Sequence, residues 1–215
     1  MLGLSISKLI IRIITLIIAF TIHEFSHAFT ANAFGDRTPK DHGRLSLNPL
    51  VHLDLFGSLL LLVAGFGWAK PVPVNPYVLN QKSPSAFMWV SLAGPLSNLL
   101  MAILASIPIR LGLIQYQIPT SSIIPTAYEF AIEFSIINLA LMLFNLIPLA
   151  PLDGEKVLDF LLPANLRSGW NKIKQYGPII LLAMVFVLPM VGIDIISMVL
   201  TPALSGLLRI LIGGF

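Results

Sequence analysis

Two histidines and a glutamate near the start of the chain have the types and spacing of a metal-dependent hydrolytic site. His23 and His27 are four residues apart, so on an α-helix their imidazoles point to nearly the same side, about one turn apart. Two imidazoles placed in this way can bind one zinc ion at about 2.0–2.1 Å each. Glu24 lies beside that side of the helix and can take a proton from a water that the metal holds. We therefore predict His23 and His27 as zinc ligands and Glu24 as the catalytic base.

The apolar surroundings of this motif favour metal binding over a surface role. The motif follows the run Ile13–Phe20, which is apolar apart from one threonine. An ionisable side chain at membrane depth is costly unless it is paired or ligated, and it usually marks a functional site. The alternative is that these side chains only make hydrogen bonds between packed helices.

A catalytic zinc ion with two histidine ligands needs a third protein ligand and an open position for water. The chain contains no cysteine, so this ligand must be an imidazole or a carboxylate. We leave the loop histidines His42 and His52 outside the site. Apart from Glu24, the acidic residues expected at membrane depth are Glu129, Glu133, Asp153 and Asp194.

Asp153 is the strongest candidate among these acids because it follows an interrupted helix end. In the segment NLIPLAPLDG, Pro148 and Pro151 break the helix and Gly154 permits a turn. A short carboxylate at such a break can point inward. Taken alone, Asp153 fits two roles equally well, a metal ligand and the N-cap of a helix over Glu155–Leu162, and both can hold together.

Two asparagines inside apolar segments are candidates for contact with substrate. Asn98 follows Gly94 and Pro95 in one segment, and Asn145 lies inside the next. Each side-chain amide could stabilise an oxyanion or hold a peptide backbone. The alternative for each is a hydrogen bond between helices.

The composition of the chain indicates that membrane-spanning helices position these residues. Of the 215 residues 56% are hydrophobic and only 11% are charged, whereas soluble domains are nearer a quarter charged. We predict an all-α polytopic membrane protein with a single domain over residues 1–215. The net charge of +3 is spread over short loops, and we expect the lipid bilayer rather than nucleic acid as a partner.

The apolar segments predict four transmembrane helices and one or two short re-entrant or interfacial segments. The predicted spans are Leu9–Phe34, Ala86–Ile109, Ala127–Leu149 and Pro178–Leu200. Two shorter apolar segments, Leu55–Phe66 and Leu204–Ile212, read as re-entrant or interfacial elements. The Pro-rich stretch Gly67–Asn80 is predicted as an extended strand that could present backbone groups to a peptide, with a plain connector as the alternative.

The basic residues predict the orientation of the chain if Leu55–Phe66 does not cross. One side of the membrane then carries the larger group of basic residues. The positive-inside rule places that side in the cytoplasm, together with the active site. The larger group is Arg37, Lys40, Arg44, Lys70, Lys82, Lys156, Arg167, Lys172 and Lys174, and the smaller is Lys8, Arg110 and Arg209.

Five motifs in order resemble the site-2 protease family of intramembrane metalloproteases, peptidase family M50, in its short form without a PDZ domain. They are HEFSHAFTA, GRLSLNPLVHLDLFG, GWAKPVPVNP, SLAGPLSN and NLIPLAPLDG. The resemblance implies one zinc ion per chain held by His23, His27 and Asp153, with Glu24 as base. It also implies that Asn98 and Asn145 lie near the scissile peptide bond and that GWAKPVPVNP faces the substrate.

The expected activity is hydrolysis of peptide bonds in transmembrane protein substrates by an integral protein of the prokaryotic cell membrane. Two alternatives belong to other classes: a membrane zinc transporter, and a catalytically silent membrane protein with a bound metal. A transporter should carry metal-binding residues along a path through several helices, and a silent protein should tolerate loss of Glu24. The physiological substrate and the oligomeric state do not follow from the sequence.

Overall fold

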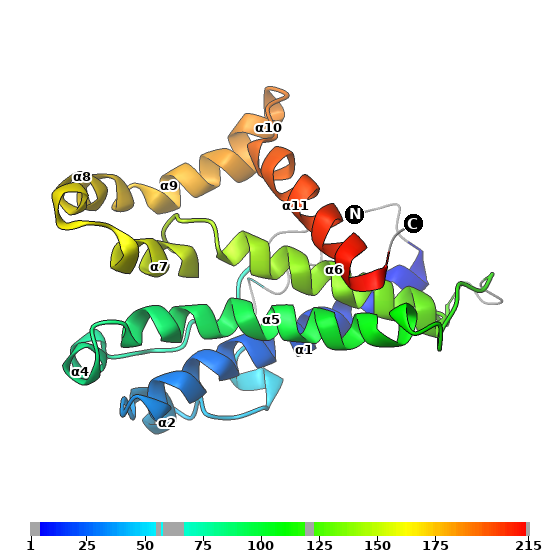
Figure 1. The fold of residues 1–215 in the computed structure, drawn as a ribbon, viewed down its shortest axis with the longest axis horizontal. Coiled ribbons are helices and arrows are strands. Elements are labelled where there is room, and N and C mark those ends of the chain that lie inside the picture. Colours follow the sequence, from blue (N-terminus) through cyan, green and yellow to red (C-terminus); the bar gives the residue numbers. More distant parts are fainter. Residues whose placement is uncertain (1–4, 55–56, 58–66, 119–122, 214–215) are drawn as a thin grey trace.

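Three long helices form the centre of the structure and lie side by side (Figure 1). The computed structural model describes residues 5–54, 57, 67–118 and 123–213. Helix α5 packs against both of the other long helices. The three are α1 (Ile6–Ala33), α5 (Ala86–Arg110) and α6 (Ala127–Asn145), which confirms the first three predicted spans to within a few residues.

Shorter helices connect and cover this central group. They are α2 (Thr38–Asp41), the 3₁₀ turn η1 (Pro49–Val51), α4 (Pro76–Lys82), α7 (Asp153–Leu161), α8 (Ala164–Lys174), α9 (Gly177–Leu182), the π-helical turn η2 (Ala183–Val187), α10 (Leu188–Met190) and α11 (Ile195–Ile212). In Figure 1, α2, α4, α7 and α8 lie at one end of the long helices, and both chain termini lie toward the other end.

Four helices are long and apolar enough to cross a membrane: α1, α5, α6 and α11. A fifth crossing is formed if Ala164–Lys174 and Gly177–Met190, which meet at a bend of 62°, make one span. The predicted all-α polytopic membrane fold with four spanning helices is confirmed.

The predicted position of the fourth span, Pro178–Leu200, is wrong. The chain leaves the helix after Met190, and Gly192 takes a positive φ of 82°. The Asp194 side chain then accepts a hydrogen bond from the Ser197 backbone N–H and caps a new helix. The predicted short segment Leu204–Ile212 is therefore the second half of α11, the fourth candidate span.

Helix α11 packs across α5 and α6 through leucine side chains. The buried residues of this contact are Ala102, Leu139 and Met142, and the α11 residues against them are Leu204, Leu207, Leu208 and Leu211. Four leucines at intervals of three, one and three residues form a single helical stripe, which explains why the apolar tail forms a long helix.

The Pro-rich stretch Gly67–Asn80 is extended in its first part only. An isolated antiparallel bridge joins Ala69 to Leu53, and within the described residues no strand ladder continues it. The prediction of a strand is wrong from Pro76 onward, because Asn75 caps the helix that begins there and proline fits its first turn. The predicted re-entrant segment Leu55–Phe66 lies, apart from Gly57, outside the described residues.

Candidate metal centre

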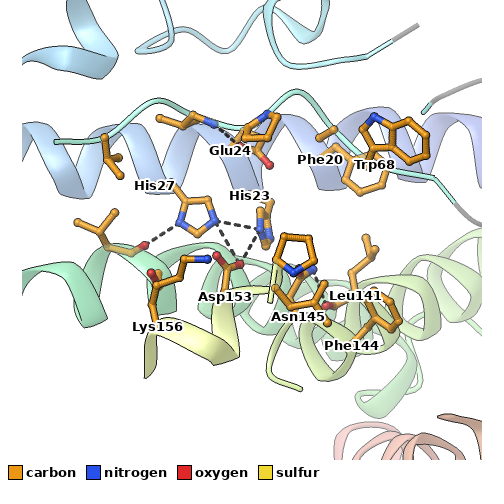
Figure 2. Close-up of a pocket in the computed structure, with 18 of the residues that line it drawn as sticks. Phe20, His23, Glu24, His27, Trp68, Leu141, Phe144, Asn145, Asp153 and Lys156 are labelled. Atoms are coloured by element: carbon orange, nitrogen blue, oxygen red, sulfur yellow. Dashed lines mark hydrogen bonds and ion pairs between the residues drawn. The ribbon is translucent and has the colours of Figure 1, made fainter. Parts of the chain in front are cut away.

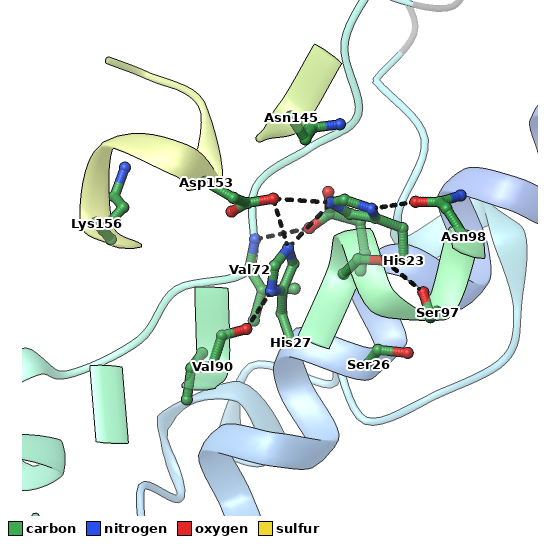
Figure 3. Close-up of polar contacts among 12 residues, drawn as sticks. His23, Ser26, His27, Val72, Val90, Ser97, Asn98, Asn145, Asp153 and Lys156 are labelled. Atoms are coloured by element: carbon green, nitrogen blue, oxygen red, sulfur yellow. Dashed lines mark hydrogen bonds and ion pairs between the residues drawn. The ribbon is translucent and has the colours of Figure 1, made fainter. Parts of the chain in front are cut away.

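His23, His27 and Asp153 converge although α1 and α7 are far apart in the sequence (Figures 2 and 3). One oxygen of Asp153, Oδ2, lies 3.2 Å from His23 Nε2 and 3.3 Å from His27 Nε2. The two Nε2 atoms are 3.0 Å apart. Among the described residues, this is the group of three or more metal-ligating side chains that the structure brings together.

Asp153 is the first residue of α7. The N-cap of α7 is Leu152, which makes no side-chain cap, so the alternative role of Asp153 as an N-cap is wrong. Gly154 allows this turn to approach the end of α6, because a Cβ atom on Gly154 would lie 2.4 Å from the Leu146 carbonyl oxygen. The close packing at Gly154 directs the Asp153 carboxylate toward the histidines.

The spacing and the free nitrogens of these residues suit a zinc ion. Two ligands at about 2.0–2.1 Å from a tetrahedral ion are separated by roughly 3.3 Å, close to the separations of these three atoms. His23 Nδ1 lies 2.6 Å from Asn98 Oδ1, and His27 Nδ1 lies 2.7 Å from the Val90 carbonyl oxygen. Because both acceptors hold a proton on Nδ1, both Nε2 lone pairs are available to a metal.

Electrostatics favour the ionised, ligating form of Asp153. Burial of the carboxyl opposes ionisation, but in the metal-free protein the charge and hydrogen bonds of His27 and His23, when these are protonated, outweigh burial and hold the pKa of Asp153 below its usual range. A carboxylate must be deprotonated to bind a metal ion.

Gly94 lets α5 approach the two imidazoles closely. A Cβ atom at this position would lie 2.4 Å from His27 Nε2 and 2.6 Å from His23 Nε2. Contacts below 3.0 Å are essentially never made by real Cβ atoms, so any larger residue would displace the helix or the imidazoles.

Glu24 is buried and faces the extended segment rather than solvent. Its Oε2 atom accepts a hydrogen bond of 3.2 Å from the Val72 backbone N–H (Figure 2). Pro71 and Pro73, on either side, have no N–H to donate. Val72 therefore supplies the amide donor of this short stretch to the carboxylate.

The extended segment is fastened on both sides of Val72. The Lys70 N–H donates to the His52 carbonyl at 2.8 Å, and the Arg44 guanidinium donates to the Lys70 carbonyl at 3.3 Å. The buried Asp36 carboxylate accepts a hydrogen bond of 2.6 Å from the Asn75 N–H. These contacts hold the segment across the site.

A cavity of about 500 Å³ opens beside the three convergent residues (Figure 2). His23, Glu24, His27 and Asp153 all contribute to its wall. Its other lining side chains are mostly apolar and include Phe20, Trp68, Val72, Val74, Phe87, Leu141, Phe144, Leu181 and Leu182. An apolar cavity with a few convergent polar groups is typical of a ligand or substrate site.

The chain is similar to proteins named as zinc metalloproteases. It is 44% identical over 180 residues to "Putative zinc metalloprotease YwhC" of Bacillus subtilis, which covers 83% of this chain and 80% of that protein. The chain belongs to this zinc metalloprotease family. "Putative zinc metalloprotease Rip2" of Mycolicibacterium smegmatis is 31% identical over 177 residues, 78% of this chain and 63% of the relative.

A Rip2 of Mycobacterium tuberculosis is 30% identical over 174 residues, 78% of this chain and 63% of that protein. The chain therefore spans less than two thirds of the length of either Rip2. No protein-family profile and no solved structure matches the chain.

The structure of this metalloprotease separates the two asparagines that sequence reasoning grouped together. Asn145 lines the cavity, and its Nδ2 donates to the Leu141 carbonyl at 3.0 Å. Asn98 is fully buried on the other side of His23 from Asp153 and is not among the cavity-lining residues (Figure 3). Its Oδ1 lies against His23 Nδ1, and its contact with a substrate stays a prediction.

Three contributors to the site were absent from the sequence predictions: the Val72 amide, the close approach at Gly94, and Asn138, whose Oδ1 accepts a hydrogen bond of 2.9 Å from Asn98 Nδ2. The prolines on either side of Val72 mark its N–H as the donor between them, but the sequence does not show which group accepts it. Asn138 precedes Asn145 by seven residues, two helical turns, and this repeat of amides on one face of a spanning helix is a signal that could have identified it.

Proposed function

We propose that this metalloprotease is an intramembrane protease of the site-2 type, which cleaves peptide bonds in transmembrane protein substrates. The observation that carries the proposal is the position of the site on α1. His23 and His27 lie six to ten residues before the end of α1 at Ala33, or about 9–15 Å along a helix that is apolar enough to span a membrane. A peptide bond must reach that depth to be cut.

One zinc ion per chain, held by His23, His27 and Asp153, is part of this proposal. When bound, zinc polarises the substrate carbonyl and lowers the pKa of a water molecule. The chain's own ligands are two neutral imidazoles and one carboxylate, so the set leaves one tetrahedral position for reactants.

Glu24 is the proposed general base and acid. Its carboxylate takes the proton of the attacking water and later gives it to the leaving amide nitrogen. The Val72 N–H orients the carboxylate from one side. Asn145, in the cavity wall, is the side-chain amide placed to contact the substrate backbone, and the apolar wall receives side chains of a membrane segment.

The active site is proposed to open toward the cytoplasm of a prokaryotic cell. The end of the bundle that carries α2, α4, α7 and α8 (Figure 1) also carries the larger group of basic residues. The positive-inside rule places such an end in the cytoplasm.

Replacement of Glu24 by Gln tests the function. We expect the Glu24→Gln protein to keep its zinc, because Glu24 is not a proposed ligand, and to lose cleavage of a model transmembrane substrate by about 10²–10⁴-fold. Bound zinc and cleavage are measured on purified protein reconstituted in liposomes. Equal cleavage by wild type and variant would overturn the protease mechanism, and zinc uptake into the liposomes would support a transporter.

A second measurement tests whether the protein prefers substrates that are embedded in the membrane. The same cleavable segment is offered once inside the bilayer and once as a shortened, water-soluble peptide. Preference for the membrane-embedded form is expected. A soluble peptide cut as fast as the membrane form would leave a metalloprotease without intramembrane specificity.

A further inference from the structure

A chain of side-chain hydrogen bonds runs from a backbone carbonyl of α6 to the metal-facing imidazole of α1. The Asn138 Nδ2 donates to the Phe134 carbonyl at 2.9 Å. Asn98 Nδ2 donates to Asn138 Oδ1 at 2.9 Å, and Asn98 Oδ1 lies 2.6 Å from His23 Nδ1. Asn98 and Asn138 are both fully buried.

The direction of these hydrogen bonds is determined by the Phe134 carbonyl, at the end farthest from His23. A backbone carbonyl can only accept, so Asn138 must present its NH₂ group to Phe134 and its oxygen to Asn98. Asn98 must then present its NH₂ group to Asn138 and its oxygen to His23. The oxygen of Asn98 requires a proton on His23 Nδ1, which leaves Nε2 free for a metal.

The two histidines differ in what holds their Nδ1 protons. For His27 the acceptor is the Val90 carbonyl, which belongs to the α5 backbone and cannot turn over. For His23 the acceptor is a side-chain amide, which would offer a donor in place of an acceptor if it rotated by half a turn. His23 therefore needs a further group that keeps the Asn98 amide in one orientation.

We propose that Asn138 is this positioning residue: it holds the Asn98 oxygen toward His23 and so prepares His23 Nε2 to bind zinc. The proposal rests on the zinc site of the proposed function. It assigns Asn98 and Asn138 to the support of the metal site and not to the substrate.

Replacement of Asn138 by Leu, which has a similar volume, removes the acceptor for the Asn98 NH₂ group. The Asn98 amide can then turn its NH₂ group to His23 Nδ1 and oppose metal binding through Nε2. We expect the Asn138→Leu protein to bind zinc about 10–100-fold more weakly, the usual effect of losing a group that orients a metal ligand. Zinc affinity is measured by competition with a chromophoric chelator.

A second substitution separates positioning from a general loss of packing. Asn98→Asp places an acceptor at both ends of the side chain, so its orientation no longer depends on residue 138. The double variant Asn98→Asp/Asn138→Leu is expected to bind zinc within a few-fold of wild type, because the new carboxylate accepts the His23 Nδ1 proton and forms a carboxylate–histidine–zinc arrangement. A cobalt-loaded sample should likewise regain the wild-type visible spectrum.

Ser135→Ala is the matched control. Ser135 is fully buried on α6 and joins α5 through a 3.1 Å contact with Ser106, but its contacts do not reach His23. Its removal should leave zinc affinity unchanged. Near-wild-type affinity of Asn138→Leu, or no recovery in the double variant, would overturn the positioning role alone. Failure of the wild-type protein to bind zinc would overturn that role and the proposed function together.

Discussion

Gly94 shows how a residue without a side chain can decide whether a metal site forms. Its Cα is close enough to His23 and His27 that a methyl group there would overlap both imidazoles. Metal ligands have to be placed to within about 0.2 Å of their ideal distances. A small shift of α5 against α1 is therefore enough to weaken the site.

Gly94→Ala is expected to weaken zinc binding on the order of 10-fold or more, because the new methyl group displaces at least one imidazole. The measurement is zinc affinity of the purified protein. Gly206→Ala is the control, since no atom lies within 4 Å of the Cβ position at Gly206 in α11. There we expect unchanged zinc affinity and about 0.5–1 kcal/mol of added stability. Unaltered zinc binding by Gly94→Ala would contradict the steric argument.

Helices α1 and α6 are joined by an ion pair inside candidate membrane spans. Arg12 Nε lies 2.8 Å from Glu133 Oε1. A charged side chain left alone among lipid tails costs roughly 2.5–3.5 kcal/mol at the centre of a helix. The pair therefore restrains the mutual position of α1, which carries the histidines, and α6, which carries Asn138 and Asn145.

Arg12→Met should lower the unfolding free energy by on the order of 2–3 kcal/mol, because Glu133 loses its partner. The charge-exchanged variant Arg12→Glu/Glu133→Arg should recover part of this loss. Stability is followed by thermal unfolding in detergent. The control is Lys8→Met, which removes a cation from an exposed position on the same helix. An equal effect of Lys8→Met would show that charge number, not pairing, is responsible.

At the scale of the whole molecule, the proposed zinc ion ties the first long helix to α7. A ligand that binds only the folded protein stabilises it by RT ln(1 + [L]/Kd), about 4 kcal/mol at a thousandfold excess over Kd. We therefore expect a chelator to lower the unfolding temperature and added zinc, but not magnesium, to restore it. In a His23→Ala/His27→Ala protein neither treatment should have an effect. Equal unfolding temperatures with and without chelator in the wild type would argue against zinc at this site.

The arrangement of the termini and loops allows the proposed orientation to be tested. Both termini and the connection between α5 and α6 lie toward one end of the bundle in Figure 1, and α8 lies at the other. The chain has no cysteine, so single cysteines can be introduced without background. Leu113→Cys should react with a membrane-impermeant maleimide in intact cells, and Lys172→Cys only after permeabilisation. The reverse pattern would place the active site on the outer side.

Local sequence determined the three central helices and the motif on α1. Long apolar runs form helices in a bilayer because each backbone group must be satisfied within its own segment. The spacing of His23 and His27 places both on one side of α1 whatever surrounds them. These features depend on neighbours in the chain, which is why the sequence alone predicts them.

Tertiary structure decided how the acids of the chain are used. Glu129 caps α6 through Thr126, Glu133 pairs with Arg12, and Asp194 caps α11. Asp153 is the one among these four that meets both histidines. The partners of Glu133 and Asp153 are distant in sequence, whereas the caps made by Glu129 and Asp194 are local. Composition and spacing could therefore identify the candidate acids but could not choose among them.

The same reason explains the remaining differences. The turn at Gly192 and the Asp194 cap, which end one helix and begin the next, are local, but the leucines of α11 that make the tail a packed span contact α5 and α6, and no local window contains those contacts. Asn98 was identified as a polar group inside a span, but its position behind His23 follows from how α5 crosses α1 at Gly94. Sequence supplied the reactive groups and the helices that carry them, whereas the packing of those helices determined which groups meet.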